Sequence, residues 1–184
     1  MRSVSLHIPK LAMALVLLGT ATATTLERLS MNDMTSQSTA IIRATVVSGA
    51  GEMEAGGIIL THYRLKLTEV WKGAKSGLVD VYVPGGAANG LRQLVPGAPT
   101  LNPGTEYLLF LWVGASGRPQ IMGLSQGMFT VTKDPSTMAT YAVRPGADER
   151  VVDPKSGQST SDPMVRMKVQ DLKTLVLKFV GAAQ

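Results

Sequence analysis

Residues 58–71 read IILTHYRLKLTEVW and decide the fold class, because apolar and polar side chains alternate along them. One face of this segment carries Ile59, Thr61, Tyr63, Leu65 and Leu67, and the other carries His62, Arg64, Lys66 and Thr68. A period of two residues is typical of a β-strand with one buried and one solvated face. The alternation changes phase at Glu69 and Val70, and a β-bulge near Thr68 and Glu69 would restore it. We therefore expect a long, bulged strand here.

Four further segments have the composition of strands. They are residues 39–48 (TAIIRATVVS), 77–83 (GLVDVYV), 105–113 (TEYLLFLWV) and 119–132 (PQIMGLSQGMFTVT). The segment 105–113 is apolar on both faces, which indicates a central strand that is covered on both sides. Gly123 and Gly127 interrupt the last segment and indicate a bulge or a corner.

Helix signals stand at both ends of these strands. Ser30 followed by Asp33 resembles a capping box and predicts a short helix that ends by residues 37–39. Asp162 and Pro163 have the residue types of an N-cap and a first helical position. The helix that they predict carries an apolar stripe at a period of 3.6 residues: Val165, Val169, Leu172, Val176 and Phe179. Residues 134–163 are polar and rich in Pro and Gly, and we expect a surface loop there with one short strand near residues 138–143.

Residues 1–23 have the pattern of a secretory signal. Arg2 and Lys10 supply the positive region, and residues 11–19 (LAMALVLLG) are apolar but too short to cross a bilayer as a helix. Residues 21–23 (ATA) form a small-x-small cleavage site, so we expect export and no integral membrane anchor. Removal of Arg2 and Lys10 lowers the net charge from +5 to +3. Because an exported chain without cysteine is ordinary in a bacterial envelope, we expect a periplasmic or extracellular location.

These elements predict a mainly β fold with flanking helices. Five short strands with corner glycines favour a small five-stranded Greek-key, OB-like barrel, with a short N-terminal helix and an amphipathic C-terminal helix. An open five-stranded α+β sheet is the alternative. The expected organisation is a signal peptide (1–23), an N-terminal helix plus barrel (24–132), a surface loop (133–163) and a C-terminal helix packed on the barrel (164–184).

Few residues point to catalysis or to a bound metal. The chain has no cysteine, and His62 is the only histidine after the expected cleavage site, so we expect no metal site and no cofactor. Residues 123–127 (GLSQG) match G-x-S-x-G, which would make Ser125 the nucleophile of a small serine hydrolase. A strand-like segment follows the motif where that fold needs a helix, and His62 precedes the serine where the fold needs it to follow. We therefore expect a protein that is not an enzyme, and keep the hydrolase as an alternative.

Two other partner classes also fit poorly. Nucleic-acid binding by a small barrel needs aromatic residues beside a positive groove, whereas this chain has few aromatic residues and an export signal. The C-terminal helix, rich in lysine, is compatible with an anionic membrane surface, which leaves a structural envelope protein as a further alternative.

Four short motifs resemble a group of uncharacterised exported bacterial proteins. They are residues 69–73 (EVWKG), 95–99 (VPGAP), 104–111 (GTEYLLFL) and 123–129 (GLSQGMF), within a stretch of about residues 30–132. That group is similar in outline to the OB-like barrel of netrin modules and of tissue inhibitors of metalloproteinases. The resemblance implies a barrel, export and a role without catalysis. The animal inhibitors chelate zinc through an N-terminal cysteine that this chain lacks, so their mechanism is not implied.

Loops on a rigid barrel commonly carry function, and residues 84–104 form the longest connection between the expected strands. We expect this connection to contact an unknown protein or peptide partner in the cell envelope. The contact residues that we name are Leu91, Arg92, Gln93, Leu94 and, from the neighbouring GLSQG segment, Gln126.

Overall fold

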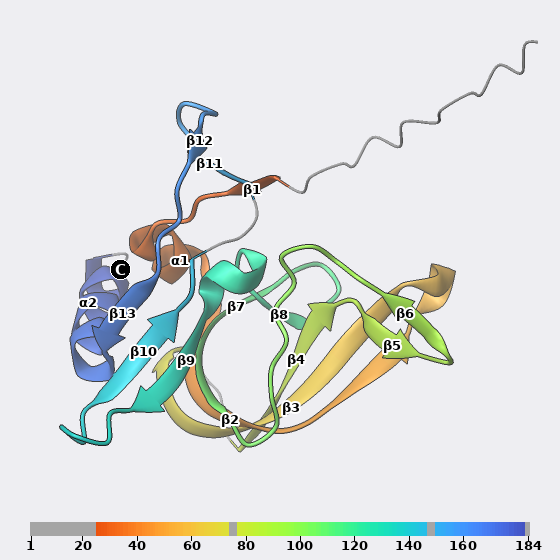
Figure 1. Cartoon of the computed structure of the whole chain (residues 1–184), viewed down its shortest axis with the longest axis horizontal. Helices are drawn as coiled ribbons and strands as arrows, with labels where there is room; N and C mark the ends of the chain where they lie inside the picture. The colour runs from red at the N-terminus through yellow and green to blue at the C-terminus, as the bar shows by residue number, and fades with distance from the viewer. Residues whose placement is uncertain (1–24, 74–76, 147–149, 183–184) are drawn as a thin grey trace, which may run out of the picture.

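The computed structural model describes residues 25–73, 77–146 and 150–182. The expected signal peptide lies outside these described residues, as does residue 24. Across these residues the fold is mainly β with flanking helices, as predicted, and it contains one eight-stranded sheet, two smaller sheets and two α-helices (Figure 1).

The elements follow one another along the chain in this order: β1 (Thr25–Glu27), α1 (Met31–Gln37), β2 (Ala40–Met53), η1 (Ala55–Gly57), β3 (Ile59–Lys72), β4 (Leu78–Pro84), β5 (Gly86–Ala88), β6 (Leu91–Gln93), β7 (Glu106–Val113), β8 (Pro119–Ile121), η2 (Leu124–Gly127), β9 (Met128–Lys133), β10 (Thr140–Arg144), β11 (Arg150–Val152), β12 (Ser159–Thr160), β13 (Val165–Lys168) and α2 (Val169–Ala182).

Five strands of the large sheet pair in a ring. The sheet order is β13-β10-β9-β7-β2-β3-β4-β8, and β8 pairs additionally with β7. One edge of β7 pairs with two strands in succession. Its first half pairs with β9, where Tyr107 lies opposite Thr130, and its second half pairs with β8, where Leu111 lies opposite Ile121. The ring β7-β2-β3-β4-β8 closes on one pair of residues, Tyr82 of β4 and Gln120 of β8.

The strand β7 lies between two hydrophobic cores, as its sequence predicts. Tyr107, Leu109 and Leu111 point into the core inside the ring. Leu108 and Phe110 point the other way, into a second core closed by α1, α2, β9 and β10. Because consecutive strand residues face opposite sides, only a strand that is apolar at every position can serve both cores.

The bulge expected in the long strand is confirmed. In the pairing of β2 with β3, Arg43 lies opposite Glu69 while Ala44 lies opposite Leu67, so Thr68 has no partner. Trp71 is likewise skipped, and it is buried in the second core. These unpaired residues shift the alternation of side chains, so that apolar residues after Glu69 again face the interior.

The short N-terminal helix is also confirmed. Ser30 Oγ accepts a hydrogen bond from the Asp33 amide, and Asp33 Oδ2 accepts from the Ser30 amide, which completes the capping box. At the other end, Lys72 Nζ donates to the carbonyl oxygens of Thr35 and Ser36 at 2.7 and 3.0 Å. These carbonyls have no partner within the helix, so a cation from β3 satisfies them.

Three predicted boundaries are wrong. The segment 119–132 is not one strand: the 3-10 turn η2 divides it into β8 and β9, and the large sheet has eight strands rather than five. The C-terminal helix begins at Val169 rather than at Pro163, because residues 165–168 pair with β10 as a strand. The expected loop 133–163 contains β10, β11 and β12, of which only β10 was predicted.

Candidate functional site

Ser125 and His62 do not form a catalytic pair. Ser125 lies on η2, and a strand follows it where a nucleophile elbow would need a helix. His62 lies on β3 with both ring nitrogens engaged: Nδ1 is 3.0 Å from Glu52 Oε1, and Nε2 is 2.8 Å from Asp80 Oδ1. The imidazole is thus bonded to carboxylates of β2 and β4, not to the serine hydroxyl that it would have to activate.

The His62 ring links three strands on the outside of the ring of strands. It stacks on Tyr82 with ring centroids 4.7 Å apart, and Arg118 lies 5.1 Å from the centre of the same Tyr82 ring. Arg118 also pairs with Glu54 at 2.9 Å. Burial alone would lower the pKa of His62, but the hydrogen bonds to Asp80 and Glu52 outweigh it and raise that pKa above its ordinary value. The hydrogen bond from His62 in turn lowers the pKa of Asp80.

Metal binding and membrane spanning find no support in the part of the chain that the structure describes. Among those residues, no group of three or more His, Cys, Asp or Glu side chains is arranged to hold a metal ion. Within the same residues, no helix combines the length and the apolar character needed to cross a bilayer.

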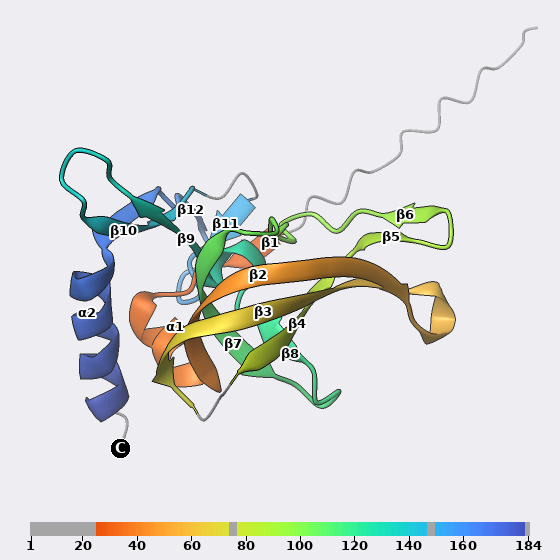
Figure 2. The same ribbon diagram turned by 90° about the horizontal axis from the view of Figure 1, so that it is seen from below.

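The connection 84–104 folds into a two-stranded ribbon, β5–β6, with an Asn89-Gly90 turn between its strands. The ribbon lies against the far half of the β2–β3 hairpin (Figure 2). Both turn residues have positive φ, 51° at Asn89 and 76° at Gly90, as a type I′ hairpin turn requires. The sequence contains this turn dipeptide, so its position could be predicted while its packing partner could not.

Two contacts hold the ribbon on the hairpin. The Ile59 amide donates a hydrogen bond to Gln93 Oε1 at 2.7 Å. On the other strand, β5 approaches β2 so closely that a Cβ on Gly51 would lie 2.0 Å from the Ala87 carbonyl oxygen. Glycine at position 51 is therefore required for the backbones to come this near.

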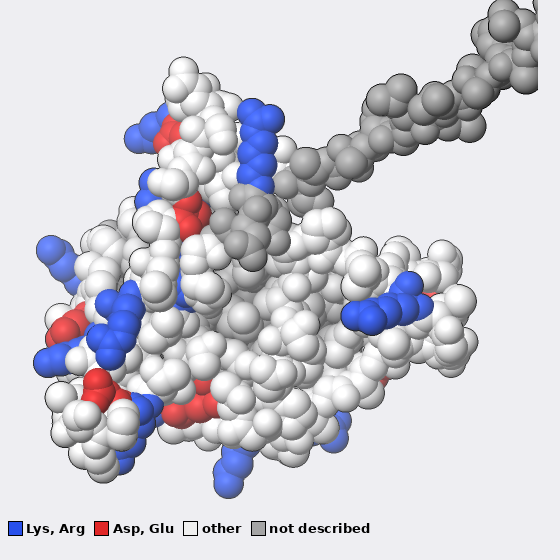
Figure 3. Space-filling model, viewed as in Figure 1, with Lys and Arg blue, Asp and Glu red and all other residues white. Residues whose placement is uncertain are grey.

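The anchored ribbon leaves apolar side chains in solvent. Leu91 is 60% exposed and Leu94 is 77% exposed, and Leu94 is the most exposed large hydrophobic residue among those described. Arg92 between them is exposed, and it is the only basic residue in the ribbon. Figure 3 shows few charged side chains on the middle of this face of the molecule.

A small cavity of about 130 Å³ lies beside Leu94. Tyr63 and Val83 of the sheet line one wall, and Leu94 and Pro99 of the connection line the other. A cavity of this size admits one side chain rather than a whole ligand.

Two of the predicted contact residues have structural roles instead. Gln93 is half-buried and fixes the ribbon to β3. Gln126 is fully buried away from the ribbon: its Oε1 accepts from the Leu29 amide at 2.9 Å, and its Nε2 donates to the Glu27 carbonyl at 2.8 Å. The side-chain amide of Gln126 thus bonds backbone groups of the segment that leads into α1. Because its own polar atoms are satisfied by these bonds, the glutamine can be buried. The surface contact set is thus reduced to Leu91, Arg92 and Leu94.

Sequence reasoning missed the carboxylates around His62, since both lie on neighbouring strands. A hairpin centred on Gly56 brings Ala50 opposite His62, so Glu52 becomes a diagonal neighbour. The register of β4, which brings Tyr82 opposite His62, depends on tertiary pairing that local sequence does not fix.

Comparison with known proteins adds no relative to this description. No protein-family model matches the chain, and a search of curated proteins found no match either.

Proposed function

We propose that this chain is an exported, non-enzymatic binding domain with a small OB-like Greek-key barrel, and that its β5–β6 ribbon contacts a protein or peptide partner in the cell envelope. The export step rests on the signal pattern of residues 1–23. The expected location is the periplasm or the extracellular space.

The ring of pairings among β2, β3, β4, β7 and β8 supports the barrel. Closure through backbone hydrogen bonds is what separates a barrel from an open sheet. The strands β9, β10 and β13 then form an extension of the barrel wall that carries the second core and α2. The resemblance to netrin modules and tissue inhibitors of metalloproteinases is in keeping with this proposal.

The single observation that carries the binding role is the exposure of Leu91 and Leu94 on an anchored ribbon. Exposed apolar side chains are normal when scattered, but two in close succession on one short ribbon, beside a small cavity, favour a contact surface. The Gln93 hydrogen bond and the Gly51 contact hold the ribbon before binding, so little conformational entropy is lost when a partner docks.

The chemistry of the ribbon indicates the partner surface. Leu91 and Leu94 fit an apolar patch or apolar side chains of an extended peptide, and Arg92 between them fits an acidic group. Arginine at a partly desolvated contact contributes more than lysine, because its planar head pairs with a carboxylate through two hydrogen bonds.

The test compares partner capture by two double variants. Leu91→Ser/Leu94→Ser removes the proposed contact, and Met138→Ser/Met164→Ser removes two methionines that are 61% and 66% exposed elsewhere. The immobilised wild-type protein and the methionine variant should retain the same envelope protein, which the leucine variant loses. Reconstitution with that purified partner should give a dissociation constant at least about tenfold weaker for the leucine variant. Equal affinity for the two double variants would contradict the proposed surface.

The absence of catalysis has its own test. A fluorophosphonate probe labels a serine only when a base activates it, and His62 is held by Glu52 and Asp80. We expect no adduct on Ser125 of the folded protein by mass spectrometry. An adduct that Ser125→Ala abolishes would establish the hydrolase alternative.

A further inference from the structure

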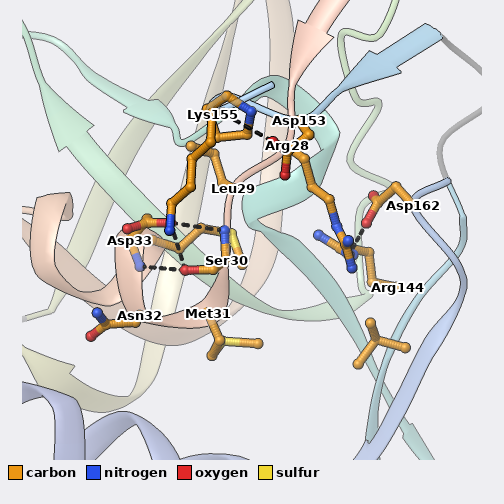
Figure 4. A pocket seen from close by; sticks show the side chains of 13 residues that line it. Arg28, Leu29, Ser30, Met31, Asn32, Asp33, Arg144, Asp153, Lys155 and Asp162 are labelled. Atoms are coloured by element: carbon orange, nitrogen blue, oxygen red, sulfur yellow. Dashed lines mark hydrogen bonds and ion pairs between the residues drawn. The ribbon is translucent and has the colours of Figure 1, made fainter. Parts of the chain in front are cut away.

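A cavity of about 620 Å³ opens at the other end of the molecule from the ribbon. It lies between the segment that leads into α1, the turn that joins β11 to β12, and the residues before β13. Figure 4 shows Arg28, Arg144 and Asp162 gathered on one side of it and Lys155 on another, above Ser30 and Asp33. Three cationic side chains thus line one cavity.

Arg144 is the buried member of this group. Its side chain is 7% exposed, and that of its partner Asp162 is 3% exposed. Arg144 NH2 donates to Asp162 Oδ1 at 2.7 Å, and NH1 donates to the Gln126 carbonyl at 3.1 Å. The third nitrogen, Nε, is buried without an acceptor among the described residues. Buried donors are nearly always bonded, so this unsatisfied nitrogen on a residue that lines the cavity is an exception.

Arg28 brings a second positive charge to Arg144. Burial lowers the pKa of Arg144, Asp162 counteracts this, and the charge of Arg28 lowers it again. Asp162 pairs with Arg144 alone, so Arg28 adds a second guanidinium charge near Arg144 without a carboxylate partner of its own among the described residues. An anion between them would relieve that repulsion and supply acceptors to both.

The remaining carboxylates of the cavity are used by their own turns. Asp33 Oδ2 accepts from the amide and the hydroxyl of Ser30. Asp153 Oδ1 accepts from the Lys155 amide and from the amide and hydroxyl of Ser156. Across residues 25–73, 77–146 and 150–182, neither Arg28 nor Lys155 forms an ion pair. The formal charges of the cavity balance, and Arg28 and Lys155 are its cationic groups that have no ion pair among the described residues.

We propose that this cavity binds a small molecule through a carboxylate or phosphate group placed between Arg28 and Arg144. Arginine pairs match the planar, bidentate geometry of such oxyanions. Lys155 provides a further charge on the opposite wall, and Leu29, Met31 and Val165 offer an apolar surface to the rest of the molecule. The volume lies within the range of about 300–1,000 Å³ that small-molecule sites have.

This site is independent of the ribbon, so either proposal can fail while the other holds. The ribbon offers leucines to a protein surface, whereas the cavity offers the exposed Arg28 and the buried Arg144 to an anion.

The test is an NMR titration of the full-length exported protein with three probes: hexanoate, inorganic phosphate, and hexanamide as the uncharged counterpart of hexanoate. We expect saturable shifts at the amides of Arg28 and Asp153 and at the Arg144 Nε signal with at least one of the two anions, and none with hexanamide. Tighter binding of hexanoate identifies a carboxylate ligand with an apolar body, and tighter binding of phosphate identifies a phosphorylated one.

Two exposed arginines provide matched variants. Arg28→Gln removes a cavity cation, and Arg150→Gln removes the same charge from β11 without lining the cavity. Arg28→Gln should weaken the affinity for the anion about tenfold, because a charge-assisted hydrogen bond is lost. Arg150→Gln should change affinity by less than about twofold, because salt screens a distant surface charge. Equal weakening by both variants, equal binding of hexanamide, or no saturable shift with either anion would overturn the proposal.

Discussion

At the scale of single residues, His62 has the most informative environment. Nδ1 faces Glu52 and Nε2 faces Asp80, and both partners are acceptors when they are ionised. Only the protonated imidazolium donates from both nitrogens. Arg64, which also bonds Asp80, and Arg118 and Glu54 on the far side of Tyr82 complete the charged groups around it. His62 therefore stabilises the β2–β3–β4 contact as a cation.

This arrangement predicts how stability depends on pH. A raised pKa means that the folded protein holds the proton more tightly than the unfolded chain does. The stabilisation is therefore complete below the unfolded pKa of about 6.5, and it is lost as pH rises through the higher folded value. His62→Gln should remove about 0.5–1 kcal/mol at mildly acidic pH and almost nothing at alkaline pH.

Urea unfolding of both proteins across this pH range measures the difference, and an NMR titration of the ring gives the pKa directly. A wild-type advantage that persists or grows toward alkaline pH would show that the imidazole is not the doubly donating cation described above.

Local sequence predicts a residue's role where its partners are near in the chain. The capping box of Ser30 and Asp33 spans three residues, and both of its hydrogen bonds are present. Gln126 accepts a hydrogen bond from Leu29, 97 residues away, and the local sequence GLSQG does not predict that partner. Its polar character and its place between two glycines were compatible with an exposed turn, whereas its burial is set by the segment that packs over it.

At the scale of elements, one turn occurs twice. In residues 134–139 (DPSTMA) and 153–158 (DPKSGQ), the first aspartate accepts from the amides two and three residues later. The backbone bonds are also the same, with Met138 and Gly157 donating to the carbonyl of the first residue. Both residues have positive φ, 57° and 66°. Glycine adopts this conformation without strain, whereas methionine does not.

Replacement of the strained residue should therefore stabilise the protein. Met138→Gly should raise the free energy of unfolding by roughly 0.5–1 kcal/mol, since relief of left-handed strain exceeds the added entropy of the unfolded chain. Gly157→Ala is the reverse test and should cost about 1 kcal/mol, although nothing lies within 4 Å of a Cβ there. Chemical denaturation checks both. Destabilisation by Met138→Gly would mean that the exposed methionine makes a contact that the turn geometry does not reveal.

The ribbon makes a second prediction at this scale. Gly51→Ala places a methyl group against the Ala87 carbonyl, and overpacking of this kind costs about 1–3 kcal/mol. Because the ribbon is the smaller part, we expect it to separate from β2 while the large sheet remains folded. Hydrogen exchange should then become faster at the Ile59 amide, which bonds to Gln93, and stay unchanged at Leu65 in the core.

Gly181→Ala is the control for this variant, because a Cβ at position 181 meets open space. Unaltered exchange at Ile59 in Gly51→Ala would mean that the close approach does not hold the ribbon.

The type of an element was predicted correctly where the hydrophobic periodicity is long, and incorrectly where it is short. The alternation in β3 runs over nine residues and gave the strand, its faces and its bulge. The boundary between β13 and α2 was predicted wrongly, because two patterns overlap there. Val165 and Val169 are four residues apart and fit the apolar stripe of a helix, while residues 165–168 also alternate as a strand does. Pairing with β10 decides between the two, and that information is not local.

At the scale of the whole molecule, α2 closes the second core. Val169, Leu172 and Val176 are buried against the sheet and α1, so the apolar stripe of α2 is used within the fold. We expected this helix to pack on the barrel, and its buried side chains lie in the second core. The helix is thus a part of the core rather than an appendage.

A pair of leucine variants in α2 tests this role. Leu172 is fully buried, and Leu172→Ala should lower the free energy of unfolding by about 2–5 kcal/mol. Leu177, on the exposed side of the same helix, should tolerate alanine within about 0.5 kcal/mol. Small, equal effects on the soluble protein would argue that the helix serves another surface, such as a membrane.

The arrangement of the described residues separates three regions: a ribbon that presents leucines, a ring of paired strands, and a second core beside a cavity lined by three basic and three acidic side chains. The mainly β fold and the two-sided strand β7 followed from the sequence pattern. The ribbon's packing and the cavity depend on contacts between distant segments, such as Gly51 with Ala87 and Arg144 with Asp162, and they needed the structure.

The most direct measurement is site-specific photo-crosslinking in bacterial cells that produce the protein with residues 1–23 in place. A photoreactive residue at Leu94 samples the ribbon, and one at Met138 samples an exposed apolar position elsewhere. We expect one discrete adduct with an envelope protein from position 94, lost when Leu91→Ser is added, and none from position 138. The same adducts from both positions, or none from position 94, would contradict a binding role for the ribbon.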